Sequence, residues 1–587
     1  MKQFLKSTLA VVLGCLIFSL LFIFIAIGII SSVGGEKIES LKSNSILMLK
    51  FNNPIPDLKD NVVTEPSKIF SEGETLGLME VLKSIEHASN DPKIKGILLE
   101  PELRFTGWAT IASVRTALEK FKEKGKFIYA FTNAGWGQSE YYLASVADKI
   151  YMNPMGSIDL HGFGVEIDFV KGTLDKLGVK ANVFYAGKFK SATEMFRRTD
   201  MSPENKIQMR ELLTEFHKNY VEAVGKSRKL TPAQLNDIFN SLGARNANLA
   251  LKNGIIDRIA YKDQLIDDLK EKLGVKPEDD IKSKTLEEYF EATNPMDYGK
   301  GSEVAVVYAE GSIVDDSEES STIGGEQYCK ILRKIRKEKE AKAVVLRVNS
   351  GGGSALASEM IWRECERLKA AGIPVVVSMG NYAASGGYYI SAGANRVFAE
   401  PNTITGSIGV FGMIPNIKGL MTNTLGVTVD TVKTTKFGIS NPVYFDFNTE
   451  EAAMMQESVD TIYNRFKSVV ASGRKMDLNK VEEVAQGRVW TGRKALELKL
   501  VDELGSLNDA IKHAAKLAGI GEKYSVNNFP KQEDAMTKIF KKFGLKTSIE
   551  AMVAQQLGLP KPNAEIMYYL TNHKSIQAKL PFNISIK

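Results

Sequence analysis

The sequence contains little histidine and little cysteine. Its five histidines are His87, His161, His217, His513 and His573, and none lies in the serine-containing glycine motifs of the second half. This argues against a Ser-His-Asp triad, and the histidine of the string SIDLHGFG is interpreted as structural. The three cysteines are too few for a disulfide framework, and their spacing is not that of a metal site. We therefore expect buried thiols, no metal and no cofactor.

A strong excess of one charge is also absent. The chain of 587 residues carries 76 basic and 70 acidic side chains, a net charge of +6. So small an excess gives little support for nucleic-acid binding, and no nucleic-acid partner is expected. With 44% hydrophobic and 25% charged residues, the composition is that of a folded globular protein. At this length, two or more domains are expected.

Only one segment of the sequence is apolar enough to span a membrane. It follows Lys2 and Lys6, and its 22-residue core from Leu9 to Ile30 would form a helix about 33 Å long, sufficient for the hydrocarbon layer. Because an A-x-A-like cleavage site is missing, we expect an uncleaved transmembrane signal anchor over 8–33, although the small residues at 31–35 leave cleavage open as an alternative. The preceding lysines place the amino terminus in the cytoplasm. The predicted location is the inner (plasma) membrane, with a single pass and the body on the periplasmic (extracytoplasmic) side.

The body consists of two related halves, 45–295 and 303–530. In both, short apolar runs alternate with longer amphipathic stretches, which predicts an α/β fold with mainly parallel sheets. Matching residues, such as Tyr141 and Tyr388, lie 247 positions apart. The remaining segment, 531–587, is a basic tail of unknown role.

The two halves differ from one another in a complementary way. Ser385 of the second half stands opposite Gln138, whereas Lys190 of the first half stands opposite Gly438. A second difference concerns two neighbouring glycines, Gly352 and Gly353, which face Phe105 and Thr106. Each half has therefore kept groups that the other has lost. This pattern predicts one composite active site that needs both halves.

Ser385 is the candidate nucleophile. It lies in the motif AASGG, between an apolar run and a helix-like stretch, and a serine at such a strand-to-helix turn is accessible to a substrate. The N–H of Gly386 directly after it is a natural donor to an oxyanion. The motif SGGGS supplies a second donor, for which Gly353 is the candidate because glycine lets the backbone approach a substrate closely. Either glycine cluster alone could be an ordinary loop turn, but the two together favour an oxyanion hole.

Lys190 is the candidate general base. Without a histidine in the motif region, a lysine held neutral by burial is the conventional alternative for activating a serine. Lys190 lies in the apolar and aromatic stretch VFYAGKFKSATEMF, with Lys188 as a neighbouring lysine. Ser407, in TITGSIGVFG, is placed to hydrogen-bond the amine and orient it.

These motifs resemble those of a known family. The strings VNSGGGS, AASGGYYIS and TGSIGVFG, preceded by GKFKSATEMF, are similar to those of the signal peptide peptidase A family in its long, duplicated bacterial form, within peptidase family S49. The resemblance covers about 45 to 530 and includes the amino-terminal anchor. Gly351 is a departure, because the family commonly has proline at that place.

The resemblance implies tandem duplicated ClpP/crotonase-like ββα spiral domains. It also implies a membrane-anchored serine protease that hydrolyses remnant signal peptides and other extended apolar peptides through an acyl-enzyme, and that assembles as a homotetramer. In that family Ser385 would be the nucleophile, Lys190 the general base and Ser407 the lysine-orienting residue, with Gly353 and Gly386 as the oxyanion hole. Two alternatives stay open: a crotonase-like enzyme acting on acyl-CoA, and a non-catalytic membrane scaffold on the same fold.

Overall fold

The computed structural model describes residues 41–58, 75–103, 106–296, 301–317, 321–531 and 577–579, with Gly14, Ile17 and Phe18 near the amino terminus. The expected anchor at 8–33 lies outside these ranges apart from those three positions, and so does most of the tail that follows residue 531. Across the described ranges, no helix combines the length and the hydropathy needed to cross a membrane.

A parallel sheet forms the centre of the first half. Its strands run in the order β8-β5-β3-β2-β1-β9, and every neighbouring pair is parallel. The strands are β1 (Ser45–Leu49), β2 (Ile94–Leu99), β3 (Phe127–Thr132), β5 (Lys149–Met152), β8 (Arg258–Ile259) and β9 (Ser283–Thr285).

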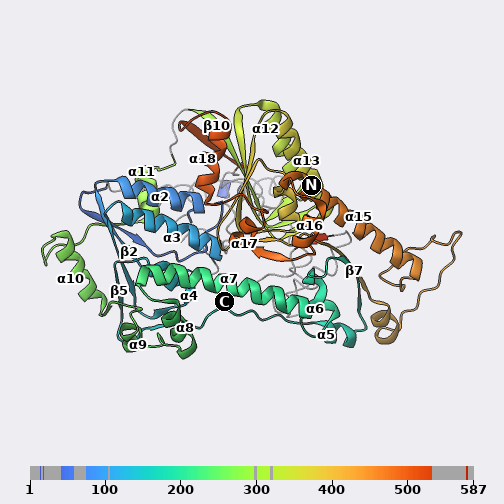
Figure 1. The fold of residues 1–587 in the computed structure, drawn as a ribbon, viewed down its shortest axis with the longest axis horizontal. Coiled ribbons are helices and arrows are strands. Elements are labelled where there is room, and N and C mark those ends of the chain that lie inside the picture. Colours follow the sequence, from blue (N-terminus) through green and yellow to red (C-terminus); the bar gives the residue numbers. More distant parts are fainter. Residues whose placement is uncertain are drawn as a thin grey trace, which may run out of the picture.

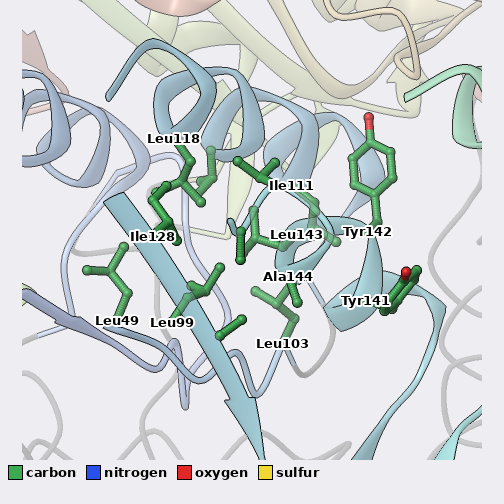
Figure 2. Close-up of a cluster of buried hydrophobic side chains, with 14 of the residues drawn as sticks. Leu49, Leu99, Leu103, Ile111, Leu118, Ile128, Tyr141, Tyr142, Leu143 and Ala144 are labelled. Carbon is green, nitrogen blue, oxygen red and sulfur yellow. The ribbon is translucent and has the colours of Figure 1, made fainter. Parts of the chain in front are cut away.

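Helices cover both faces of this sheet. On one face, Leu99 of β2 and Ile128 of β3 belong to the same cluster as Leu118 and Leu143 of the covering helices (Figure 2). On the other face, a smaller cluster joins Ile46 and its neighbours to a single helix. Burial on both sides explains why the strands are almost continuously apolar. The helices are α2 (Leu78–Asn90), α3 (Trp108–Glu123) and α4 (Gln138–Ala144) on the first face and α10 (Lys262–Leu273) on the second.

The second half repeats this plan. Its main sheet has the order β19-β17-β15-β13-β10-β21, with β16 and β20 attached beside β15, and only the β17–β19 pair is antiparallel among the described strands of this sheet. The strands are β10 (Ser302–Glu310), β13 (Ala341–Ser350), β15 (Val375–Ala384), β16 (Arg396–Ala399), β17 (Ile404–Gly406), β19 (Val489–Thr491), β20 (Glu503–Leu504) and β21 (Tyr524–Phe529). The covering helices are α12 (Gly325–Glu338), α13 (Ala355–Ala370) and α14 (Gly386–Ser391) on one face and α18 (Leu507–Leu517) on the other.

Two turns of the chain in the second half contribute a long strand, one or two short strands and a helix. After β13, the short strand β14 (Gly352–Ser354) precedes α13, and after β10 two short strands precede α12. These short strands form a separate sheet of order β12-β11-β14-β22-β18-β7, together with β22 and the longer strands β18 (Val410–Asn416) and β7 (Lys180–Ala186), whereas β4 and β6 pair with each other. The prediction of a duplicated α/β fold built from ββα units is therefore confirmed. The short strands not yet given are β4 (Gly135–Trp136), β6 (Ser157–Ile158), β11 (Ser312–Val314), β12 (Thr322–Gly324) and β22 (Gln577–Lys579).

The two halves exchange elements. Strand β7 (Lys180–Ala186) of the first half pairs antiparallel with β18 (Val410–Asn416) of the second. The long helix α7 (Pro203–Arg228) runs beneath both halves in Figure 1, and its Met209 and Phe216 pack with residues of β15, β17 and β19. In return, Gln456 of α15 (Thr449–Arg474) donates to the Tyr185 carbonyl in β7 at 3.2 Å. Residues of the first half are thereby carried into the second. The remaining helices are α5 (Lys171–Lys176), α6 (Glu194–Arg197), α8 (Pro232–Ser241), α9 (Ala247–Lys252), α11 (Leu286–Thr293), α16 (Leu478–Val484) and α17 (Gly492–Glu497).

Buried polar contacts also join the halves. The Arg347 guanidinium on β13 donates to the Asp57 carboxylate at 2.7 and 3.0 Å, and both side chains are almost completely buried. The Asn381 side chain accepts from two N–H groups at the start of α3, at 3.1 Å each. Such contacts have fixed geometry, so they set how one half sits on the other.

The two cysteines within the described ranges are the buried thiols that the sequence predicts. Cys329 lies in α12 and Cys365 in α13, and neither forms a disulfide. Burial raises the pKa of Cys329 to about 11 and that of Cys365 to about 12, so both thiols stay protonated near neutral pH.

Candidate active site

Ser385 occupies the turn between β15 and α14. Its φ of 54° and ψ of −116° are rare for a residue with a side chain, and such a conformation costs on the order of 1–3 kcal/mol unless the surroundings hold it. Two backbone hydrogen bonds do so: Ser385 N–H donates to the Gly406 carbonyl, and its own carbonyl accepts from Tyr389, both at 2.8 Å. The turn brings the Ser385 hydroxyl to the carboxyl end of the parallel sheet, where ligands of α/β folds usually bind.

Lys190 reaches this serine from the other half. It follows β7, its side chain is only 1% exposed, and its Nζ lies 2.8 Å from Ser385 Oγ. Nζ also lies 3.0 Å from Ser407 Oγ and 3.2 Å from the Ser407 carbonyl oxygen. Burial holds the pKa of Lys190 well below its usual range. The structure therefore brings together the three side chains that the sequence singled out.

These contacts fit a neutral amine. A neutral Lys190 Nζ has two N–H groups and one lone pair, and Ser407 offers two acceptors in its carbonyl and hydroxyl oxygens. The lone pair is then free to accept the Ser385 hydroxyl proton. A neutral amine so placed can act as a base, whereas an ammonium group cannot.

The two glycine clusters lie next to each other at this site. Ser350, at the end of β13, pairs with Ala383 of β15. A Cβ placed on Gly387 would lie 2.6 Å from the Ser350 carbonyl oxygen, so α14 begins directly against the SGGGS loop. Gly386 is the first residue of α14, where an N–H has no intrahelical acceptor. A Cβ placed on Gly353 would come within 1.9 Å of the Ile313 carbonyl oxygen, so only glycine fits at that position.

The strand that contains Gly353 has an antiparallel neighbour from the carboxyl-terminal tail. Gly352, Gly353 and Ser354 of β14 pair with Lys579, Ala578 and Gln577 of β22. On its other side, β22 pairs with Phe411 of β18. The space between β14 and β18 therefore accepts an extended peptide backbone.

The equivalent place in the first half is filled. Gln138, which stands where Ser385 stands in the second half, is buried at the start of α4. Its Nε2 donates to the Gly162 carbonyl at 2.8 Å, and its Oε1 accepts from the His161 and Gly162 N–H groups at 3.1 and 2.6 Å. Both polar atoms of the Gln138 side chain are thus hydrogen-bonded to backbone groups of the same half. Thr106 is described and its hydroxyl is buried, whereas Phe105 lies outside the described residues.

One side chain near the lysine was not singled out from the sequence. Gln208 of α7 donates to the Phe189 carbonyl at 3.1 Å and to Ser191 Oγ at 2.9 Å, on either side of Lys190. No sequence pattern marks it, because its partners come together only in the folded chain. The one signal in the sequence is helical periodicity, which places Gln208 on the buried face of α7.

Comparisons with known proteins agree with the motifs. The family model for peptidase family S49 matches this chain twice, over 120–276 and 367–521. Protease 4 of Haemophilus influenzae is 34% identical over 576 residues, which cover 92% of this chain and 91% of that protein. Protease 4 of Salmonella typhi is 38% identical over 451 residues, or 75% of this chain and 72% of that protein. Serine protease SPPA, chloroplastic, of Arabidopsis thaliana is 31% identical over 491 residues, or 82% of this chain and 70% of that protein. The chain therefore belongs to peptidase family S49 and is a serine protease.

Proposed function

We propose that Ser385 is the nucleophile of this protease and Lys190 its general base. The observation that carries the proposal is the 2.8 Å contact between Lys190 Nζ and Ser385 Oγ, in a site where burial holds the pKa of the amine well below its usual range. In the first step the Nζ lone pair takes the hydroxyl proton while Oγ bonds to the scissile carbonyl carbon. The Gly353 and Gly386 N–H groups donate to the resulting oxyanion, and one such donor contributes about 10²–10³ in rate.

The same amine completes the reaction. Protonated Nζ gives its proton to the leaving nitrogen as the C–N bond breaks, which leaves the acyl group as an ester on Ser385. Water then attacks this ester, Lys190 accepts a proton from the water, and Ser385 Oγ takes that proton as the ester breaks. While Nζ is charged, it donates to both oxygens of Ser407, which stabilise the ammonium without a carboxylate. Ser407 in this way orients the lysine.

We infer that the substrates are extended, apolar peptides, including remnant signal peptides. The pairing of β22 with β14 supports an extended backbone beside Gly353, since a substrate strand can form the same hydrogen bonds. The family motifs support signal peptides as the substrate class. Membership of a peptidase family disfavours the acyl-CoA enzyme and the non-catalytic scaffold.

Membrane anchoring and self-association are further parts of the proposal. The apolar run from Leu9 to Ile30 supports a single-pass anchor in the inner (plasma) membrane, with the protease body on the periplasmic side. Leu425, Val429 and Val432 are exposed on the segment that projects between β18 and α15 (Figure 1). Exposed apolar side chains gathered on one projecting segment support contacts between copies of the chain, as a homotetramer requires.

The test is labelling with a serine-reactive fluorophosphonate, together with hydrolysis of an apolar reporter peptide. We expect Ser385→Ala and Lys190→Ala each to lose both signals. Lys188→Ala is the matched control, because Lys188 is exposed, two residues away, and its ammonium lies over the Phe189 ring rather than in the site. Labelling of Lys190→Ala at the parent rate would refute the lysine as base. Labelling that survives Ser385→Ala would refute the assignment of Ser385 as the nucleophile.

A further inference from the structure

A turn of the second half holds the loop that carries Lys190. The turn, Gln486–Gly487–Arg488, lies between α16 and β19. The Gln486 carbonyl accepts from the Phe189 N–H at 2.8 Å, and the Gln486 side-chain oxygen accepts from the Lys188 N–H at 3.1 Å. The two residues before Lys190 are therefore fixed by one residue of the other half.

Gly487 lies directly against the Lys190 backbone. A Cβ placed on Gly487 would lie 2.7 Å from both the backbone nitrogen and the Cβ of Lys190, closer than carbon atoms approach in proteins. From the facing side, a Cβ placed on Gly187 would lie 2.5 Å from the Gln486 carbonyl carbon. The two chains thus meet backbone to backbone, and neither side leaves room for a methyl group.

The same turn also holds Ser407. The Arg488 carbonyl accepts from the Ser407 N–H at 2.7 Å, and the Gly487 N–H donates to the Ile408 carbonyl at 2.8 Å. Ser407 supplies two of the oxygens that surround Lys190 Nζ. The three residues of this turn therefore hold two parts of the site. On one side they bind the loop that carries Lys190, and on the other they bind Ser407, whose oxygens contact the Lys190 amine.

We infer that Gly487 and Gln486 are positioning residues of the dyad, which set the place of Lys190 relative to Ser385 and Ser407. This inference rests on the proposed function. A methyl group at Gly487 displaces the Lys190 backbone, and an error of about 1 Å at a reacting group lowers the rate by about 10²-fold. A displaced amine is also less buried, so its pKa rises toward the usual lysine value.

The experiment compares Gly487→Ala with Gly519→Ala in the full chain. Gly519 follows α18 with a φ of +68°, and a Cβ placed on it meets no described atom within 4 Å. Gly519→Ala therefore has the same backbone cost without the contact. For Gly487→Ala we expect kcat to fall about 10²-fold with little change in KM, and the pH–rate profile to move to higher pH. For Gly519→Ala we expect the parent kcat and profile. Equal behaviour of the two variants would overturn the inference.

A second variant covers the case in which Gly487→Ala does not fold. Gln486→Ala keeps the backbone contacts and removes the acceptor of the Lys188 N–H, together with the side-chain donor to the Glu482 carboxylate. We expect a smaller fall in kcat, about 3- to 10-fold, as is typical of one lost hydrogen bond, again with a profile moved to higher pH. A Gln486→Ala enzyme with the parent kcat and profile would also overturn the inference. Activity retained by Lys190→Ala would instead refute the proposed function, so the two failures are distinguishable.

Discussion

The Lys190 amine and the Ser385 hydroxyl lie 2.8 Å apart, although the two residues are separated by 195 positions and belong to different halves. The exchange of elements between the halves makes this contact possible. Strand β7 leads to Lys190 and pairs with β18 of the second half, while α7 returns across β19. Because the hydrogen-bond partners of the Lys190 amine, Ser385 and Ser407, come from the second half, neither half contains the arrangement alone.

The pH dependence of catalysis follows from the burial of Lys190. Only the neutral amine can accept the Ser385 proton, and burial holds the Lys190 pKa well below the usual 10.5. We expect kcat/KM to rise with pH as Lys190 loses its proton and to level off well below pH 10.5. The measurement is a pH–rate profile together with the pH dependence of fluorophosphonate labelling. A rate that does not change from weakly acidic to alkaline pH would contradict lysine as the base.

The buried lysine also lowers stability in a pH-dependent way. Because the Lys190 pKa is lower in the folded chain than in the unfolded chain, the unfolded chain binds more protons between the two values. The free energy of unfolding therefore rises with pH in this interval, by about 1.4 kcal/mol per pH unit. It reaches its full value only above the usual lysine pKa of 10.5.

Lys190→Met removes this contribution. We expect the variant to be more stable than the parent at neutral pH, and the difference to shrink as the pH is raised. Denaturant unfolding at several pH values measures both free energies. Methionine removes hydrogen bonds to Ser385 and Ser407, but their loss changes stability equally at all these pH values. A difference that does not vary with pH would show that Lys190 is not held neutral.

Gly353 is expected to tolerate no side chain. A methyl group there would overlap the Ile313 carbonyl and move the N–H that we assign to the oxyanion hole. Gly353→Ala should lower kcat by about 10²–10³, measured with the reporter peptide. Gly164→Ala is the control, since a Cβ on Gly164 meets no described atom within 4 Å. A Gly353→Ala enzyme with near-parent kcat would exclude Gly353 as an oxyanion donor.

The ion pair between Asp57 and Arg347 is expected to be important for joining the halves. Asp57→Ala leaves the buried Arg347 guanidinium without its carboxylate, which typically costs about 3–5 kcal/mol. Thermal or denaturant unfolding measures the loss. The exposed pair of Arg396 and Glu503 provides the comparison, since breaking such a surface pair by Glu503→Ala should cost less than about 1 kcal/mol. Equal losses for the two variants would show that the buried pair does not hold the halves together.

How much the sequence predicted depended on whether a signal was local. Repeated motifs predicted the duplicated α/β fold, and reciprocal differences between the repeats singled out Ser385 and Lys190. Gln208 and Gln486 were missed, because no sequence pattern links them to their partners, which they meet only in the folded chain. The pairing of β22 with β14 had no local signal at all.

That pairing predicts competition between the carboxyl-terminal strand and the substrate. Ala578 of β22 lies opposite Gly353, where an extended substrate backbone is also expected to lie. Ala578→Pro removes an N–H and disfavours strand pairing, whereas Ala578→Gly keeps the N–H as a control. If the tail occupies the substrate position, the proline variant should show a lower KM for the reporter peptide, with kcat unchanged. The glycine variant should remain close to the parent. An unchanged KM in the proline variant would mean that the tail strand and the substrate bind at different places, and that β22 is a permanent part of the sheet.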